Sequence, residues 1–199
     1  MNKFTRRTVI AAACAAAAMT FAPMSFAQQA PEKKDVTIAV GGKSLYYYLP
    51  LSIAEQLGYF KDEGLNVKIV DFQGGSRSLQ AVVGGSADVV SGAFEHTISM
   101  QAKKQPMTAF VLQGRAPQLA LVVSNKTMKD YKQLSDLKGK KVGVTAPGSS
   151  SQMVANFILK KGGLGPKDVA FIGVGSSSGA VSAIRSGQID ALINLDPVI

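Results

Sequence analysis

Residues Leu79–Val90, LQAVVGGSADVV, align without a gap with residues Val181–Leu192, VSAIRSGQIDAL. The matched pairs are Ala81 with Ala183, Val82 with Ile184, Gly85 with Gly187 and Asp88 with Asp190. In each copy the apolar face of a helix ends at a glycine, which suits a C-cap, and a strand begins close to an aspartate. Two such copies, 102 residues apart, predict two lobes of like topology.

Strands and helices are expected to alternate on both sides of this repeat. The apolar patterns predict strands at 36–40, 66–71, 87–91, 107–113, 119–124, 141–145, 169–172 and 190–194. They predict helices at 51–60, 94–101, 151–161 and 179–186, with a short one after the glycine turn near residue 75. The alternation is typical of an α/β fold with mostly parallel sheets.

Four of the strand-to-helix junctions are small and hydroxylated. They are 74–76 (GGS), 91–93 (SGA), 147–151 (PGSSS) and 176–178 (SSS). Ligands of open parallel sheets bind beyond the carboxyl ends of the strands, where glycine allows close approach and free amides favour negative charge. A lone serine at a helix start is usually only a cap. Four in equivalent places favour a cleft for a small anionic ligand.

The first 27 residues have the pattern of an export signal. Basic residues precede an Ala-rich apolar run, which ends in small residues with cleavage expected after Ala27. The run is too short to span a membrane. Both Sec export and, because of Thr5-Arg6-Arg7, twin-arginine export remain open, and either leads to the periplasm. Cys14, the single cysteine, lies in this signal, so the mature chain is expected to lack thiols.

The charge and the titratable residues exclude several other functions. The formal net charge of +9 falls to +6 without the signal, and the remaining basic residues are scattered, with no interleaved aromatic residues for nucleic acid. His96 is the single histidine, so no metal site and no cofactor is predicted. We interpret His96 as a helix histidine satisfied by its neighbours, with a ligand contact or a proton switch as the alternative.

Three longer stretches together resemble a known family. They are YYYLPLSIAEQLGYFKDEGLNVKIVDFQGGSRSLQAVVGGSADVVSG (46–92), LKGKKVGVTAPGSSSQMVANFILKKGGLGPKDVAFI (137–172) and AIRSGQIDALINLDPVI (183–199). Their order resembles the periplasmic substrate-binding proteins of nitrate, sulfonate and taurine ABC importers, which are related to the fungal thiamine-pyrimidine synthesis proteins. The resemblance implies a type II periplasmic-binding fold, in which two lobes close over a solute and deliver it to an inner-membrane permease.

The resemblance also implies where the solute is bound. The family's ligand contacts correspond to Ser44, Tyr46, Gly74, Gly75, Ser76, Ser91, Gly92, Ser149, Ser150, Ser151 and Asp196. The implied organisation is a signal peptide at 1–27, a first lobe at 36–120, a hinge strand at 121–125 and a second lobe at 126–199. Members of the family continue further, so we expect a second lobe truncated at Ile199, in a fragment or a truncated gene product, and a hinge with one crossing.

The expected function is extracytoplasmic binding of a small anionic solute such as nitrate, a sulfonate or taurine, by a protein that is monomeric when complete. Thiamine-pyrimidine precursor binding or synthesis is one alternative, and a receptor that serves a sensor is another. The resemblance to the fungal enzymes implies a cysteine-rich motif, which the predicted mature chain does not contain. We therefore do not expect an enzyme.

Overall fold

The computed structural model describes residues 31–199, of which Glu32–Ile199 form one compact unit. The predicted signal at 1–27 lies outside the described residues. None of the helices from residue 31 onward is long and apolar enough to cross a membrane.

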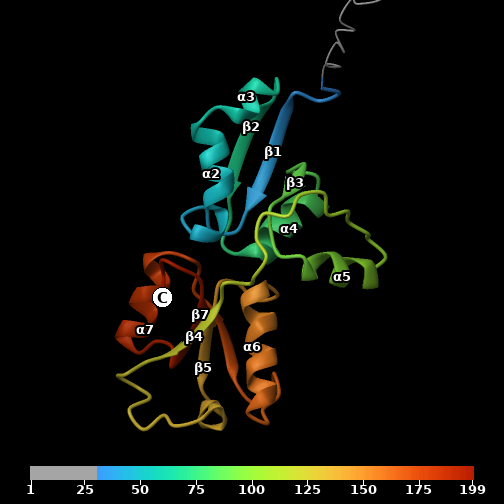
Figure 1. Cartoon of the computed structure of the whole chain (residues 1–199). Coiled ribbons are helices and arrows are strands. Elements are labelled where there is room, and N and C mark those ends of the chain that lie inside the picture. Colours follow the sequence, from blue (N-terminus) through green and yellow to red (C-terminus); the bar gives the residue numbers. More distant parts are fainter. Residues whose placement is uncertain (1–30) are drawn as a thin grey trace, which may run out of the picture. The chain divides into compact units, whose positions relative to one another are not determined.

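The first lobe is built around a three-stranded parallel sheet. Its order is β2-β1-β3, with β1 (Asp35–Val40) between β2 (Asn66–Asp71) and β3 (Val89–Val90). Side chains alternate between the two faces of β1. Val40 packs into the cluster that includes Phe60, whereas Ala39 packs with Ala81 of the opposite cluster. The helices of this lobe are α2 (Leu49–Gln56), α3 (Tyr59–Asp62), α4 (Gly75–Val83) and α5 (Glu95–Ala102) (Figure 1).

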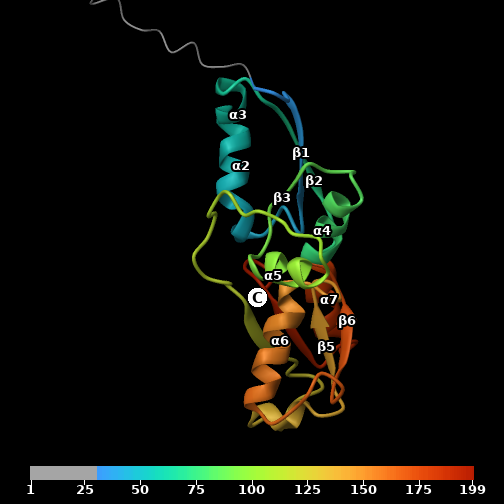
Figure 2. The same cartoon turned by 90° about the vertical axis from the view of Figure 1, so that its right-hand side faces the viewer.

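The second lobe contains a four-stranded sheet in the order β4-β7-β5-β6. Its strands are β4 (Ala120–Val123), β5 (Lys141–Val144), β6 (Ala170–Gly173) and β7 (Ala191–Asn194), and only β4 is antiparallel to its neighbour. The helices α6 (Ser150–Lys161) and α7 (Ser178–Ser186) lie on opposite faces of this sheet (Figures 1 and 2). Ala191 accordingly packs with Leu159 of α6, and Leu192 packs with Ala183 of α7.

The internal repeat is present in the structure down to individual hydrogen bonds. The order β2-β1-β3 in the first sheet corresponds to β6-β5-β7 in the second. Asp88 precedes β3 and accepts a hydrogen bond from the backbone N–H of Thr37 in β1, at 2.9 Å. Asp190 precedes β7 and accepts one from the N–H of Lys141 in β5, also at 2.9 Å. The prediction of two lobes of like topology is therefore confirmed.

Two predicted elements differ from the structure. The helix expected at 51–60 is divided into α2 and α3, because Gly58 has a positive φ of 81° that ends the regular helix. The strand expected at 107–113 is absent, and residues 105–119 contain no helix or strand. An apolar run forms a strand only beside a partner that pairs with its backbone, and the side chain of Val111 is instead 72% exposed.

The two lobes are connected at more than one place. The chain enters the second sheet at β4, as expected of a hinge strand, and β4 pairs along its length with β7. Immediately after β7, Leu195 is buried in the core of the first lobe, and the carbonyl of Asp196 accepts a hydrogen bond of 3.0 Å from the N–H of Tyr46. The chain therefore contacts the first core again after β7 through Leu195, and a hinge with one crossing near 121–125 stays a prediction.

Candidate functional site

The loop that follows β1 is held by hydrogen bonds to its backbone. The N–H groups of Gly42 and Lys43 both donate to Oδ1 of Asp71, at 2.7 and 2.9 Å. The N–H of Gly41 donates to the hydroxyl of Tyr48 at 3.1 Å, and burial raises the pKa of that phenol to about 12. These contacts fix the path of the chain at the carboxyl end of the central strand.

Glycines allow this loop to approach two other junctions closely. A Cβ atom at Gly41 would overlap the backbone of Gly74 and Gly75, which begin α4. A Cβ atom at Gly42, whose φ is 118°, would overlap the hydroxyl of Ser176 in the second lobe. The glycine pair after β1 therefore allows the start of α4 and the loop at Ser176 of the other lobe to lie against the β1 loop. The sequence prediction omitted Gly41 and Gly42, although a glycine pair directly after a strand is a usable signal.

Three residues form a direct hydrogen-bonded contact between the lobes, which we call the interlobe serine contact (Ser76, Pro147 and Ser149). The N–H of Ser76 donates to Oγ of Ser149 at 3.0 Å, and the Ser149 hydroxyl donates to Oγ of Ser76 at 3.1 Å. The Ser76 hydroxyl in turn donates to the carbonyl of Pro147 at 2.9 Å. Ser149 is fully buried and makes no side-chain capping bond to its own helix.

The other two serines of this turn have different surroundings. Ser151 is fully buried inside the second lobe, where its Oγ accepts a bond of 3.0 Å from the N–H of Thr145 and lies 2.9 Å from Thr145 Oγ1. Ser150 is half-buried. Gln152 supplies the acceptor at the helix start, because its Oε1 receives the N–H of Gly148 at 2.7 Å. Among the hydrogen bonds of residues 31–199, Ser149 is therefore the only serine of this turn that is bonded to the first lobe.

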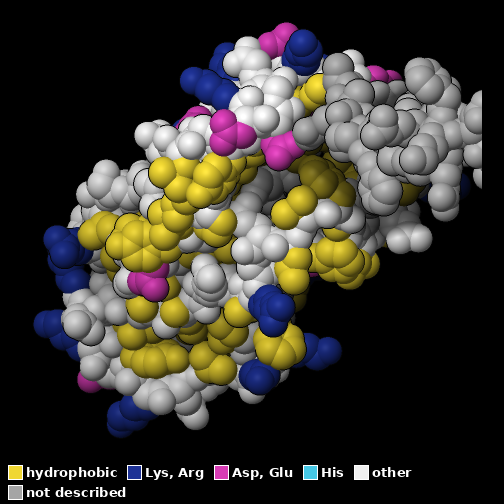
Figure 3. Space-filling view, turned by 45° about the horizontal axis from the view of Figure 1, so that its top comes forward, with side chains coloured by type: hydrophobic (Ala, Val, Ile, Leu, Met, Phe, Trp, Pro, Cys, Tyr) yellow, Lys and Arg dark blue, Asp and Glu magenta, His cyan; other side chains and the backbone are white. Residues whose placement is uncertain are grey.

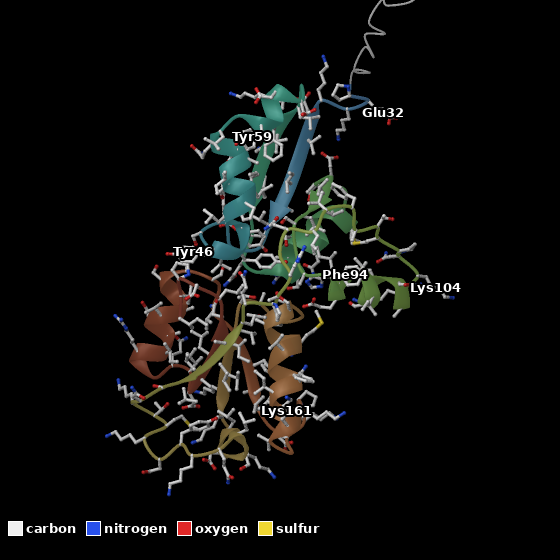
Figure 4. The ribbon with its side chains drawn as sticks, in the orientation of Figure 1. Glu32, Tyr46, Tyr59, Phe94, Lys104 and Lys161 are labelled. Atoms are coloured by element: carbon white, nitrogen blue, oxygen red, sulfur yellow. The ribbon has the colours of Figure 1, made fainter. Side chains whose placement is uncertain are left out.

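The remaining predicted site residues lie in two other places. The Ser91 hydroxyl donates to Oε1 of Gln113 at 2.7 Å, and Gln113 donates to the carbonyl of Tyr47 at 2.6 Å. Gly92 lies beside the ring of His96. Ser44, Tyr46 and Asp196 are exposed, and Tyr46 lies beside the start of α2 (Figure 4). The structure thus places Gly74, Gly75, Ser76 and Ser149 together and links Tyr46 to Asp196 through the backbone.

His96 differs from the sequence interpretation. Its side chain is buried, and its Nε2 has no hydrogen-bond partner in the described part of the chain. Burial lowers the pKa of the imidazole; the Glu95 carboxylate raises it and the Lys103 ammonium lowers it further. The prediction that neighbours satisfy this histidine is wrong for Nε2, because the adjacent Gly75 and Gly92 offer no side-chain acceptor or donor. Within residues 31–199 no group of three His, Cys, Asp or Glu side chains is arranged to hold a metal ion.

Comparison with solved structures shows what this fold is similar to. A protein of Bordetella bronchiseptica RB50 is 67% identical, with a TM-score of 0.82, over 83% of this chain and 52% of that one. The alkanesulfonate-binding protein SsuA of Xanthomonas axonopodis pv. citri, bound to MOPS, is 22% identical, with a TM-score of 0.61, over 84% of this chain and 56% of that one. This second likeness shows the fold, a two-lobed α/β architecture shared with periplasmic binding proteins.

Comparison with curated proteins and with family models shows which family the chain belongs to. The 4-amino-5-hydroxymethyl-2-methylpyrimidine phosphate synthase of Schizosaccharomyces pombe is 27% identical over 81% of this chain and 45% of its own length. The chain spans about half the length of the proteins that it matches. Residues 46–198 match the family described as NMT1/THI5 like, and this match covers most of the chain. The chain therefore belongs to the NMT1/THI5-like family.

Proposed function

We propose that this chain is the solute-binding component of an ABC importer and holds a small anionic solute, such as nitrate, a sulfonate or taurine, between its two lobes. The observation that carries the proposal is the interlobe serine contact. There the start of α4 from one lobe meets the start of α6 from the other. Two lobes that touch through helix starts and are joined by flanking segments can separate and close again over a ligand.

The chemistry of this contact suits an anion. The N-terminus of a helix carries a partial positive charge and unpaired N–H groups, so that two such ends facing one place favour a negative ligand. In the arrangement described here, the N–H of Ser76 and the hydroxyls of Ser76 and Ser149 bond to groups of the protein itself. When the lobes separate, these groups lose their partners, and an anion that enters can accept the same hydrogen bonds. The solute would thus replace a direct contact between the lobes with a bridged one.

Named relatives support the class of ligand and the location. Apart from the SsuA protein described above, the nitrate-binding protein NrtA of Synechocystis PCC 6803 has the same fold, at 19% identity and a TM-score of 0.61. Both are proteins that bind small anions, an alkanesulfonate and nitrate, and NrtA is periplasmic. By analogy with these proteins, we propose that this chain is exported, that it is cleaved after Ala27, and that it delivers its solute to a permease in the inner membrane. The proposed contacts remain the site residues that the family resemblance implies, with Ser149 as the central one.

A direct test is ligand-dependent thermal unfolding of the full exported chain with nitrate, taurine and short alkanesulfonates. A ligand at 100 times its Kd stabilises the folded state by about 2.7 kcal/mol, which gives a readily measured rise in Tm. Calorimetric titration should then show weaker binding by about tenfold or more in Ser149→Ala, since a hydrogen bond to a charged group contributes about 1.5–3 kcal/mol. Ser182→Ala, which changes an exposed serine of α7, should bind like the wild type.

One alternative has its own support. The fungal relative is named as a pyrimidine phosphate synthase, so a thiamine-pyrimidine precursor belongs in the same screen. Stabilisation by the pyrimidine and by none of the anions would overturn the anion proposal and favour precursor binding or synthesis. Stabilisation by an anion without uptake through a permease would favour a receptor that serves a sensor.

A further inference from the structure

Gln113 ties the irregular segment that leads into β4 to two other parts of the first lobe. Residues 105–119 contain no helix or strand, yet Gln113 is half-buried. Its Nε2 donates to the carbonyl of Tyr47 at 2.6 Å, and its Oε1 accepts the hydroxyl of Ser91 at 2.7 Å. The side chain therefore joins this segment to the carboxyl end of β3 and to the short helix η1 (Tyr46–Tyr48).

These two bonds fix the direction of the hydrogen bond at Ser91. A carbonyl oxygen only accepts, so the NH2 group of the Gln113 amide must face Tyr47, and the amide oxygen must face Ser91. The Ser91 hydroxyl has one proton, which it gives to Gln113. What Ser91 Oγ keeps is its lone pairs. The Ser91 side chain therefore offers a ligand an acceptor and no donor, which is the reverse of what an anion needs.

A negative charge lies in the same region. Glu95 begins α5, is half-buried, and forms no ion pair in the described part of the chain. Burial and then the charge of Glu95 raise the pKa of the Tyr47 phenol, so this carboxylate acts on η1 as well. His96 does not neutralise it, because burial holds the pKa of the imidazole below its ordinary 6.5 despite the opposing effect of Glu95. This burial agrees with the absence of cyan surface on the face shown in Figure 3. The basic side chains of Lys103 and Arg115 are exposed.

The acceptor at Ser91 lies close to the interlobe serine contact. A Cβ atom at Gly75, which precedes Ser76, would lie 3.2 Å from Nε2 of His96. A Cβ atom at Gly92, which follows Ser91, would lie 3.9 Å from Cδ2 of the same ring. The two serines are thus each next to a glycine that contacts one shared imidazole. A solute with a short chain can therefore place one end at each of them.

We propose that Ser91 and Glu95 bind an ammonium group of the solute, and that the solute is a short zwitterion, an aminoalkanesulfonate or an ω-amino acid. The proposal rests on the function proposed above and narrows it, because the acid group of the same solute occupies the interlobe serine contact. The ammonium donates to Oγ of Ser91 and to the carboxylate of Glu95. Gln113 is a positioning residue, which keeps Ser91 an acceptor. Nitrate and plain alkanesulfonates have no N–H or O–H group and leave both acceptors unpaired.

Matched pairs of solutes test the proposal by calorimetric titration. Taurine is compared with ethanesulfonate, and homotaurine with propane-1-sulfonate, because the members of each pair differ by the ammonium group alone. We expect the amino compound to bind about tenfold or more tightly in each pair, as an added charged hydrogen bond does. Equal affinity within both pairs overturns this inference and leaves the proposed function in place. Binding by none of the four compounds overturns both.

Two variants test the roles of Gln113 and Glu95 through the ratio of the taurine and ethanesulfonate affinities. Gln113→Leu frees the proton of Ser91, and Glu95→Gln removes the negative charge, so each should lower the ratio by about tenfold. Gln101→Leu, at an exposed position of α5, and Glu32→Gln, also exposed (Figure 4), are the matched controls and should keep the ratio of the wild type. A purely structural role would weaken both solutes alike. A wild-type ratio in both test variants therefore overturns the proposal.

Discussion

At the scale of single residues, two aspartates perform the same task in the two lobes. Each stands just before a parallel strand and accepts an N–H near the start of the neighbouring strand, β1 in the first lobe and β5 in the second. Burial acts to raise the pKa of Asp190, but the hydrogen bond from Lys141, assisted by Thr127 and nearby lysines, outweighs it, so the pKa lies below the ordinary 3.8. For Asp88 the bonds from Lys33 and Thr37 lower the pKa in the same way.

We expect Asp190→Ala to lower the free energy of unfolding by about 1–2 kcal/mol, the lower part of the range for a lost acceptor, because the site is half-buried. The wild type should also lose stability as the pH falls below about 3.8, since a carboxylate with a lowered folded pKa binds protons more readily in the unfolded state. Urea unfolding at several pH values measures both effects. Asp130→Ala, at an exposed position, is the control, and an equal loss in both variants would contradict the assigned role.

At the scale of elements, the sequence predicted the sheets well and the loops poorly. The repeat around Asp88 and Asp190 is local and periodic, so its helices and strands could be predicted from the sequence. The run at 107–113 has the same apolar character, but pairing depends on a distant partner that the local pattern does not contain. The serines illustrate the same limit, because their hydroxyls are expected to act together, whereas Ser149 bonds to Ser76 of the other lobe and Ser151 bonds to Thr145 of its own.

The start of α6 allows a test that separates these serines. Ser151→Ala should lower the free energy of unfolding by about 1–3 kcal/mol, because it leaves the buried N–H and hydroxyl of Thr145 without their partner. Ser150→Ala should change stability little, since Ser150 is half-buried. Thermal and urea unfolding compare the two variants. Equal stability of the two would show that the Ser151–Thr145 pair contributes little.

At the scale of the whole molecule, the site depends on contacts that neither lobe contains alone. Ser76 and Ser149 are 73 residues apart, and each belongs to its own strand-to-helix junction. Their meeting depends on Gly41 and Gly42, which admit the neighbouring loops, and on the two connections near β4 and β7. The sequence could indicate the two surfaces, but a contact between them follows only from three-dimensional packing. The boundaries at 36–120, 121–125 and 126–199 stay a prediction, and β4 and β7 pair near the proposed hinge.

Leu195 is the residue on which the connection between lobes should depend most. It follows β7 of the second sheet directly, yet its side chain is 8% exposed within the core cluster of the first lobe, together with Val40 and Tyr48. Because one side chain joins the strand of one lobe to the core of the other, we expect its loss to weaken the first core and the connection between the lobes. Replacing it by alanine removes buried methyl groups and leaves a cavity, which costs about 2–5 kcal/mol.

The measurement is urea unfolding of Leu195→Ala followed by hydrogen exchange of the strand amides in both lobes. We expect a lower midpoint and a first lobe whose β1 amides exchange faster, while the β5 amides keep more of their protection, because the variant weakens the first core directly. Leu57→Ala, at a position 60% exposed on the same lobe, is the control and should leave both groups of amides unchanged. Uniformly faster exchange in β1 and β5 would mean that Leu195 stabilises the molecule as one unit. Unchanged exchange in both would mean that the β4–β7 pairing alone joins the lobes.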